Sequence, residues 1–215
     1  MNEVGQNIMS NEELDLLQEI MNIAFGKATA ELAELIDIRV ELSVPHAKII
    51  RTIELPKYLQ EEVKDYGDIS IVEQRFWSEF NGSVFLILPA GSGKELITLL
   101  TGGEEVDVFL SDPVDELEKG TLMEVGNILI GACIGKIAEL LDNKLTYSPP
   151  IVYVGDDANE LLPNSIVNSY ELTIALRTSF HFEKKDVFGF LFVLTSQESL
   201  NWLKKALHDF LEKFE

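Results

Sequence analysis

Two copies of a Glu-x-x-Asn pair are the residues of this sequence whose types and spacing could do chemistry. Glu19 and Asn22 form the first pair, and Glu124 and Asn127 form the second. Residues three apart on a helix are neighbours on the same face. Each pair would therefore place a carboxylate, which attracts cations, beside an amide, which both donates and accepts hydrogen bonds.

The first pair lies on a narrow polar stripe of a predicted helix. With about 100° per residue, Asp15, Glu19, Asn22 and Gly26 fall within about 60° of one another. The apolar residues of the same segment fall on the other side: Leu17, Met21, Ala24, Phe25, Ala28, Leu32 and Leu35. Glycine inside a helix costs about 0.5–1 kcal/mol relative to alanine, and here it would let another surface approach the amide closely.

The second predicted helix carries Glu124, Asn127 and Gly131 at the same spacing, so glycine follows asparagine in both copies. A single Glu-x-x-Asn on an exposed helix is more often solvated surface than a site, and a recent duplication could preserve both copies without a function. However, the outward positions match whereas core positions differ, such as Met21 against Gly126 and Ala24 against Leu129. The recurrence of glycine beside both asparagines favours a docking role, and the contrast between outward and core positions favours a functional face.

The whole chain reads as a duplication. The two motif helices align without a gap at an offset of 105 residues, from Asn22 to Asn127, and the alignment continues to Pro45 and Pro150. The later strand pairs align at a slightly different offset, from Gly82 to Gly189. We expect one α/β (α+β) domain over residues 1–215, made of repeats at about 10–105 and 112–215. A pseudo-twofold axis would relate the halves in a mixed, mostly antiparallel sheet covered by the two long helices.

Local signals predict where these elements begin and end. The sequence Ser10-Asn-Glu-Glu13 is a capping box, so the first helix should run from there to about residue 36. Strands are predicted at 40–44, 48–55, 69–80, 83–88, 144–147, 151–154, 171–182 and 187–194. Helices are predicted at 95–100, from Asp112-Pro113 to about 141, and at 197–214, with 56–65 a short helix or loop and 104–112 an acidic loop.

Composition excludes several classes of function. The formal net charge is −20, which disfavours nucleic acid and anionic membranes as partners; the acidity could equally serve solubility alone. The single cysteine, Cys133, cannot form an intrachain disulfide and is predicted to be a small buried residue. No signal peptide is expected at the N-terminus, and the apolar stretches look shorter than the ~20 residues of a membrane span. The predicted location is the cytoplasm.

Other motifs are weaker. The sequence Gly91-Ser-Gly-Lys94 resembles a fragment of a phosphate-binding loop, but its glycine spacing is wrong and Glu95 replaces the required Ser or Thr. His46, His181 and His208 lack metal-ligand spacing. We therefore expect neither a nucleotide site nor a metal of the protein's own.

The doubled motif resembles that of the CheC/CheX/FliY phosphatases, and CheC most of all. That family carries Asp or Ser, then Glu, Asn and Pro at the intervals of Asp15, Glu19, Asn22 and Pro45. The second copy has Glu124, Asn127 and Pro150 with the same spacing, but Gly120 stands where Asp or Ser is expected.

The resemblance implies a chemotaxis hydrolase acting on the aspartyl phosphate of a response regulator of two-component signalling, namely phosphorylated CheY. The receiver would supply its own Mg²⁺, so no cofactor of the protein itself is expected. Asn22 and Asn127 would position the attacking water, and Glu19 and Glu124 would pair with a receiver lysine. Asp15, Gly26 and Gly131 would contact the partner.

Two other functions remain open. The same fold could be a non-catalytic regulatory module that binds a receiver or the receptor deamidase CheD, although such a module would not need the Glu-Asn geometry. A flagellar switch component is a third alternative, which the lack of a C-terminal extension disfavours.

Overall fold

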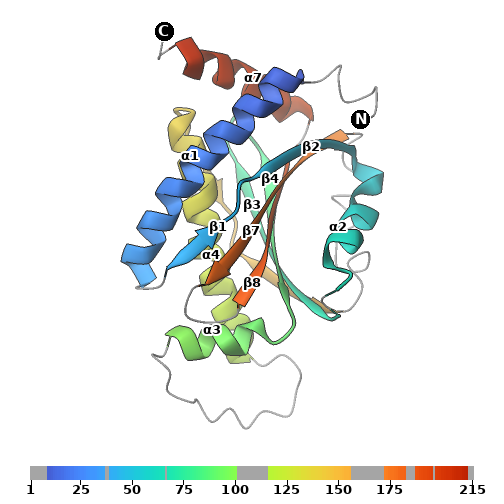
Figure 1. Ribbon diagram of the computed structural model, residues 1–215, viewed down its shortest axis with the longest axis vertical. Helices are drawn as coiled ribbons and strands as arrows, with labels where there is room; N and C mark the ends of the chain where they lie inside the picture. The colour runs from blue at the N-terminus through green and yellow to red at the C-terminus, as the bar shows by residue number, and fades with distance from the viewer. Residues whose placement is uncertain are drawn as a thin grey trace.

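A computed structural model describes residues 9–36, 39–65, 67–100, 116–155, 172–182, 187–195 and 197–212. The predicted acidic loop at 104–112 and the predicted start of the second long helix at Asp112-Pro113 lie outside these residues. One antiparallel sheet, curled and layered between helices, organises the described part (Figure 1).

The element order repeats, as the sequence predicts. The first half contains α1 (Asn11–Ile36), β1 (Val40–Leu42), β2 (His46–Arg51), η1 (Thr52–Glu54), α2 (Leu55–Val63), β3 (Ile69–Trp77), β4 (Gly82–Pro89) and α3 (Ser92–Leu100). The second contains α4 (Glu116–Leu140), β5 (Thr146–Tyr147), β6 (Ile151–Gly155), β7 (Leu172–Phe182), β8 (Val187–Thr195) and α7 (Gln197–Glu212).

The helices lie on both faces of the sheet. Helices α1, α4 and α7 cover one face and α2 covers the other (Figure 1). The larger core lies under α1, α4 and α7 and includes Leu17, Phe76, Leu129 and Phe180. A smaller core under α2 includes Leu59 and Phe192. The apolar arc of α1 therefore packs on the sheet, as the helical wheel predicts.

The two halves exchange their edge strands. The strand order is β1-β7-β8-β4-β3-β5, with β2 also on β7 and β6 also on β3. The first half's β1 and β2 thus pair with the second half's β7, whereas β5 and β6 pair with β3 of the first half. Every strand pairing in the described part of the chain is antiparallel, so the parallel component implied by a mixed sheet is not seen there.

The register of the sheet repeats with the halves. At the centre, β4 pairs with β8, and Ser83 faces Leu194. The counterpart of a residue of β4 or β8 in the other half lies 107 positions away, as Gly189 does from Gly82. The counterparts of Ser83 and Leu194 are Phe190 and Ile87, and these two residues also face each other. The pseudo-twofold axis therefore runs between β4 and β8.

Glycine is required at the two ends of this central pair. A Cβ on Gly82 would lie 2.7 Å from Cζ of Phe76, and a Cβ on Gly189 would lie 2.6 Å from Cζ of Phe180. Each would also collide with a carbonyl oxygen of the neighbouring central strand, that of Leu194 or Ile87. Both phenylalanine rings are buried, so they have little room to move away.

Helix α4 is long and apolar enough to cross a membrane by length and composition, which corrects the expectation that every apolar stretch is shorter than a membrane span. Just over half of its apolar stretch is buried inside the protein. It packs beside α1 on the sheet, with Leu122, Leu129 and Ile137 in the large core. Its composition is therefore that of a core helix.

The capping box at the start of α1 forms as predicted and also joins α1 to α7. The Ser10 N–H donates to the Glu13 carboxylate at 2.7 Å, and the Glu13 N–H donates to the Ser10 hydroxyl at 3.1 Å. Lys204 and His208 of α7 lie 3.3 and 3.7 Å from the same carboxylate. Burial opposes ionisation, but the Ser10 hydrogen bond and the two basic side chains together lower the pKa of Glu13.

We expect Glu13→Gln to lower the free energy of unfolding by about 1 kcal/mol at neutral pH. A carboxyl whose pKa is lower in the folded state stabilises the protein above its unfolded pKa, and this stabilisation is lost as the pH falls through the folded pKa. The difference between wild type and variant should therefore shrink in acid. Urea denaturation over a pH series measures it, with Glu12→Gln in the same helical turn as the control. An equal difference at all pH values would contradict this.

Candidate functional site

The polar stripe of α1 faces solvent, as the helical wheel predicts. Asp15, Glu19, Asn22 and Gly26 are all exposed, whereas Leu17, Ile20, Met21, Ala24 and Phe25 are buried. An added Cβ on Gly26 would meet nothing within 4 Å. The backbone beside Asn22 is thus open to another surface.

The stripe of α4 has the same arrangement. Glu124 and Asn127 are exposed and Gly131 is partly exposed. The space above Gly131, and above Gly120 at the counterpart of Asp15, is also open. Among the described residues, no hydrogen bond or ion pair joins the α1 pair to the α4 pair. The structure therefore presents two similar polar faces, one on each of two neighbouring helices.

A bulge in each edge strand lies at the motif's proline. Between the pairs Leu42–Phe180 and His46–Arg177, the β1–β2 side has one more residue than β7. The pairs Tyr147–Phe76 and Ile151–Glu73 show the same excess around Pro150. Proline has no N–H to donate, which suits it to a bulge.

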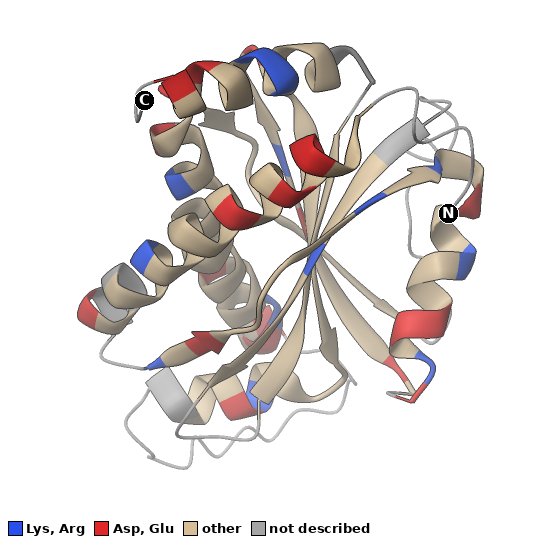
Figure 2. Cartoon of the chain, turned by 45° about the horizontal axis from the view of Figure 1, so that its top comes forward, with Lys and Arg blue, Asp and Glu red and all other residues tan. Residues whose placement is uncertain are grey.

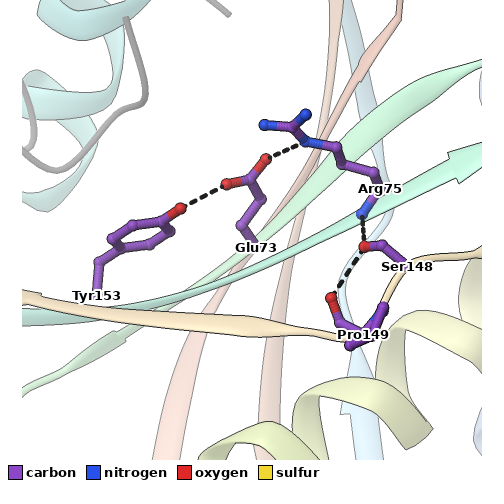
Figure 3. Close-up of polar contacts among 5 residues, drawn as sticks. All are labelled: Glu73, Arg75, Ser148, Pro149 and Tyr153. Carbon is purple, nitrogen blue, oxygen red and sulfur yellow. Dashed lines mark hydrogen bonds and ion pairs between the residues drawn. The ribbon is translucent and has the colours of Figure 1, made fainter. Parts of the chain in front are cut away.

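Each bulge is held by a serine. The Arg75 N–H donates to the Ser148 hydroxyl at 3.0 Å, and that hydroxyl donates to the Pro149 carbonyl at 2.9 Å (Figure 3). In the other half, the Ser179 N–H donates to the Ser43 hydroxyl at 3.0 Å. Ser43 and Ser148, together with the motif prolines, thus shape the strand that lies next to each helix.

The amide of Asn127 has a hydrogen-bond partner beneath it. Nε2 of Gln74, on β3, donates to Oδ1 of Asn127 at 2.7 Å and to the Ser148 carbonyl at 3.0 Å. Gln74 is only 2% exposed, whereas Asn127 remains exposed. The Asn127 side chain is therefore tethered at its inner edge while its outer edge is accessible.

The first half has a different residue at the counterpart of Gln74. Thr178 occupies that position on β7, and its hydroxyl donates to the Ser43 carbonyl at 2.7 Å. No hydrogen bond reaches the Asn22 side chain from the described residues. The carbonyl of the bulge is therefore satisfied in both halves, but only Asn127 is tethered.

The two faces also differ in shape. An open hollow of about 540 Å³ lies beside Asn22 and is lined by Gly26, Thr29, Arg39, Leu42 and Ser43, among others. In the second half, Tyr147 replaces Leu42, and its hydroxyl lies 3.7 Å from an added Cβ on Gly135. Tyr147 thus lies against α4 where the first half leaves space. Burial, with a further contribution from Cys133, raises the pKa of Tyr147 to about 12.

A buried carboxylate lies on the opposite face of β3. Glu73 is 1% exposed, and it accepts hydrogen bonds from the Tyr153 hydroxyl and from Nε of Arg75, both at 3.0 Å (Figure 3). Glu73 and Arg75 flank Gln74, and alternate residues of a strand point to opposite faces. This group therefore joins β3 to β6 behind the second site. Burial and the Glu73 carboxylate raise the pKa of Tyr153.

The glycine-rich segment set aside as a nucleotide site begins a helix. Helix α3 starts at Ser92, earlier than the predicted start at Glu95, because Gly91 adopts a positive φ of 85° and turns the chain. A Cβ on Gly93 would lie 2.7 Å from Oε1 of Glu118, which is buried. A carboxylate therefore occupies this helix start, where a phosphate would need to bind.

The histidines likewise form no metal site in the described residues. These residues contain no group of three or more His, Cys, Asp or Glu side chains placed to bind a metal ion. Cys133 is buried as predicted, and burial raises the pKa of its thiol to about 12.

Sequence reasoning identified the exposed pairs but missed Gln74. The signal that could have found it is the alternation along β3, where Val72 and Phe76 point into the large core. Gln74 lies between them, two residues from each, so its side chain points to the same face of the sheet. It is therefore a polar residue at an inward position. Thr178 of β7, between the inward residues Leu176 and Phe180, gives the same signal.

Comparisons with known proteins agree with the motif. The model of the CheC-like family matches residues 12–49. CheY-P phosphatase CheC of Bacillus subtilis (strain 168) is 29% identical over 147 residues, which are 68% of this chain and 68% of that protein. Flagellar motor switch phosphatase FliY of the same strain is 24% identical over 153 residues, which are 71% of this chain but only 38% of that protein.

The fold has a close structural relative. The crystal structure of Thermotoga maritima FliY matches with a TM-score of 0.67 and 19% sequence identity, covering 97% of this chain and 100% of that one. At this identity the likeness concerns the fold, and the α/β architecture around an antiparallel sheet is thereby confirmed.

Proposed function

Because the chain fits the CheC/CheX/FliY family, we propose that it is a phosphatase that hydrolyses the aspartyl phosphate of a phosphorylated CheY-like receiver. The observation that carries the proposal is the doubled, exposed Glu-Asn stripe with open space above the neighbouring glycine. Two relatives named as phosphatases support this class of activity.

In this mechanism the protein does little covalent chemistry. Hydrolysis of an acyl phosphate requires a water molecule held in line with the phosphorus, and positioning is the main contribution of a catalyst. The amides of Asn22 and Asn127 are suited to that task because they donate and accept hydrogen bonds without a proton transfer. The receiver would supply the phosphorylated aspartate and the Mg²⁺ that neutralises phosphate charge.

Glu19 and Glu124 would anchor the receiver. Each lies one helical turn before its asparagine, is exposed, and makes no hydrogen bond or ion pair with the described residues. Pairing with a receiver lysine would set the register of the docked helix and so place the amide at the phosphate. Asp15 extends the carboxylate stripe of α1 only, since Gly120 replaces it on α4.

The charge distribution agrees with a protein partner. Figure 2 shows Asp and Glu spread over the helices, and the net charge is −20. A surface of this sign favours a partner with a basic patch or a bound cation. Such a receiver is a cytoplasmic protein, so the cytoplasm is the location that we propose for this chain.

The direct test follows the decay of a phosphorylated CheY-type receiver with and without this protein. The receiver is phosphorylated with a small phosphodonor, the donor is removed, and the remaining aspartyl phosphate is measured over time in Mg²⁺. We expect decay to accelerate in proportion to the amount of protein added. Unchanged decay with receivers that bind the protein would rule out the phosphatase and favour a regulatory module that binds a receiver or CheD.

The glycines beside the asparagines provide a further prediction. We expect Gly26→Ala and Gly131→Ala each to stabilise the protein by about 0.5–1 kcal/mol, because both glycines are helical and an added Cβ meets nothing. Gly26→Leu and Gly131→Leu together should nevertheless weaken receiver binding about tenfold or more, since the bulkier side chain separates the two surfaces.

Thermal unfolding and titration with the receiver measure the two effects separately. Asn201→Leu, which adds a bulky side chain at an exposed position of α7 outside both stripes, is the control for the two changes. Normal receiver binding by the double leucine variant would contradict a docked surface at these glycines.

A further inference from the structure

We propose that Gln74 is a positioning residue of the second site, which fixes the orientation of the Asn127 amide, and that the first site lacks such a residue. The inference rests on the proposed phosphatase function. It assigns a role to a buried side chain in the half of the chain opposite to the asparagine that it holds.

The orientation follows from one backbone group. The Ser148 carbonyl can only accept a hydrogen bond, so the Gln74 atom 3.0 Å from it must be the amide nitrogen. The same nitrogen lies 2.7 Å from Asn127, whose facing atom must then be its carbonyl oxygen. A fixed carbonyl on the edge strand thereby determines, through Gln74, which way the Asn127 amide points.

This orientation suits the chemistry. With Oδ1 directed inward, the NH₂ group of Asn127 points outward, where it can donate to a phosphoryl oxygen. Oδ1 has a second lone pair, which remains able to accept from a water molecule. An amide held in this way does not have to find its orientation when the receiver docks, and pre-organisation of this kind lowers the barrier to reaction.

The first site offers the natural comparison. Thr178 takes the position of Gln74, and its hydroxyl is bonded to the Ser43 carbonyl at 2.7 Å. A threonine side chain is too short to reach both that carbonyl and the helix above. Asn22, which lines an open hollow, has no such partner among the described residues, so the receiver would have to orient its amide on docking.

Burial supports a specific role for Gln74. It is 2% exposed, and its Oε1 atom is buried without a hydrogen-bond partner among the described residues. An unsatisfied buried oxygen is unfavourable, so core packing alone would favour an apolar side chain such as those of Val72 and Phe76. The side chain is instead one whose nitrogen spans the carbonyl and the asparagine.

The experiment first inactivates one site and then changes the residue beneath the asparagine of the other. In Asn22→Ala protein, where only the second site can act, Gln74→Met preserves the side-chain length but removes the donor. We expect kcat for dephosphorylation of the receiver to fall about three- to tenfold, because the Asn127 side chain regains the rotational freedom that Gln74 restricts. KM and receiver affinity should stay unchanged. Gln18→Met is the matched control, because the Gln18 amide oxygen accepts from the Ala47 N–H of β2 at 2.9 Å and makes no hydrogen bond with either asparagine among the described residues.

The reciprocal variant tests for a gain, which structural damage cannot produce. In Asn127→Ala protein, Thr178→Gln should raise kcat of the first site by a similar factor. Thermal unfolding of every variant shows whether it is folded. If the Thr178→Gln variant does not fold, the Gln74→Met result alone decides whether the inference holds. An unchanged kcat in Gln74→Met, or a change confined to KM, would overturn the inference.

The outcomes separate this inference from the proposed function. If wild type accelerates decay and Asn22→Ala retains activity that Gln74→Met does not reduce, the phosphatase stands and the role of Gln74 fails. If Asn22→Ala has no activity, the second site is not the pre-organised one and the inference also fails. If wild type does not accelerate decay of any receiver that it binds, the proposed function itself fails.

Discussion

Phosphorylated receiver mixed with the Asn22→Ala/Asn127→Ala variant is expected to decay at its unassisted rate. The loss relative to wild type should be about 100-fold or more at saturating protein, because the variant can still dock but no longer holds a water molecule in line with the phosphorus. Both asparagines are exposed, so the variant should remain folded, with a modest loss of stability because Asn127→Ala removes one acceptor from the buried Gln74 amide.

Single variants and a control complete this test. Asn22→Ala and Asn127→Ala alone should each leave measurable activity, since two sites share the task. Asn201→Ala, an exposed asparagine on α7, should behave as wild type. If the double variant still accelerated decay, the catalytic amide would have to be elsewhere in the chain.

The second large effect concerns stability. We expect Gly82→Ala and Gly189→Ala each to lower the free energy of unfolding by about 3 kcal/mol, because the new methyl group meets a buried phenylalanine ring and a backbone carbonyl that cannot move apart independently. The two costs should be similar, since the pseudo-twofold axis gives both glycines equivalent surroundings.

Urea denaturation measures this effect, and Gly120→Ala is its control. Gly120 is helical and exposed with nothing near an added Cβ, so that substitution should stabilise the protein by about 0.5–1 kcal/mol. Equal and small effects at Gly82, Gly189 and Gly120 would contradict the close packing of the central strands.

The helix faces and most strands could be predicted from the sequence because they depend on local patterns. The spacing of Asp15, Glu19 and Asn22 determines one exposed face of α1 whatever the helix packs against. The apolar run from Ser83 to Leu88 likewise predicts β4 directly. Element ends were predicted less well, as at α3, where the positive φ of Gly91 moves the start of the helix to Ser92.

Long-range pairing could not be predicted in the same way. Nothing local to Val40–Leu42 indicates that its partner is β7 of the other half, because that choice depends on how the whole sheet closes. The contact between Gln74 and Asn127 depends on that closure too. The role of Gln74 could therefore not be predicted from the sequence, although its polar side chain at an inward position of β3 is a visible signal.

The exchange of edge strands has a consequence for how such a chain could arise. Neither half contains the partner of its own edge strands, and the Asn127 of one half is held by the Gln74 of the other. An ancestor of half this length could have built the same sheet only as a pair of chains that swapped these strands. Fusion of the two copies would then have freed the positions corresponding to Gln74 and Thr178 to differ, which identical subunits could never do.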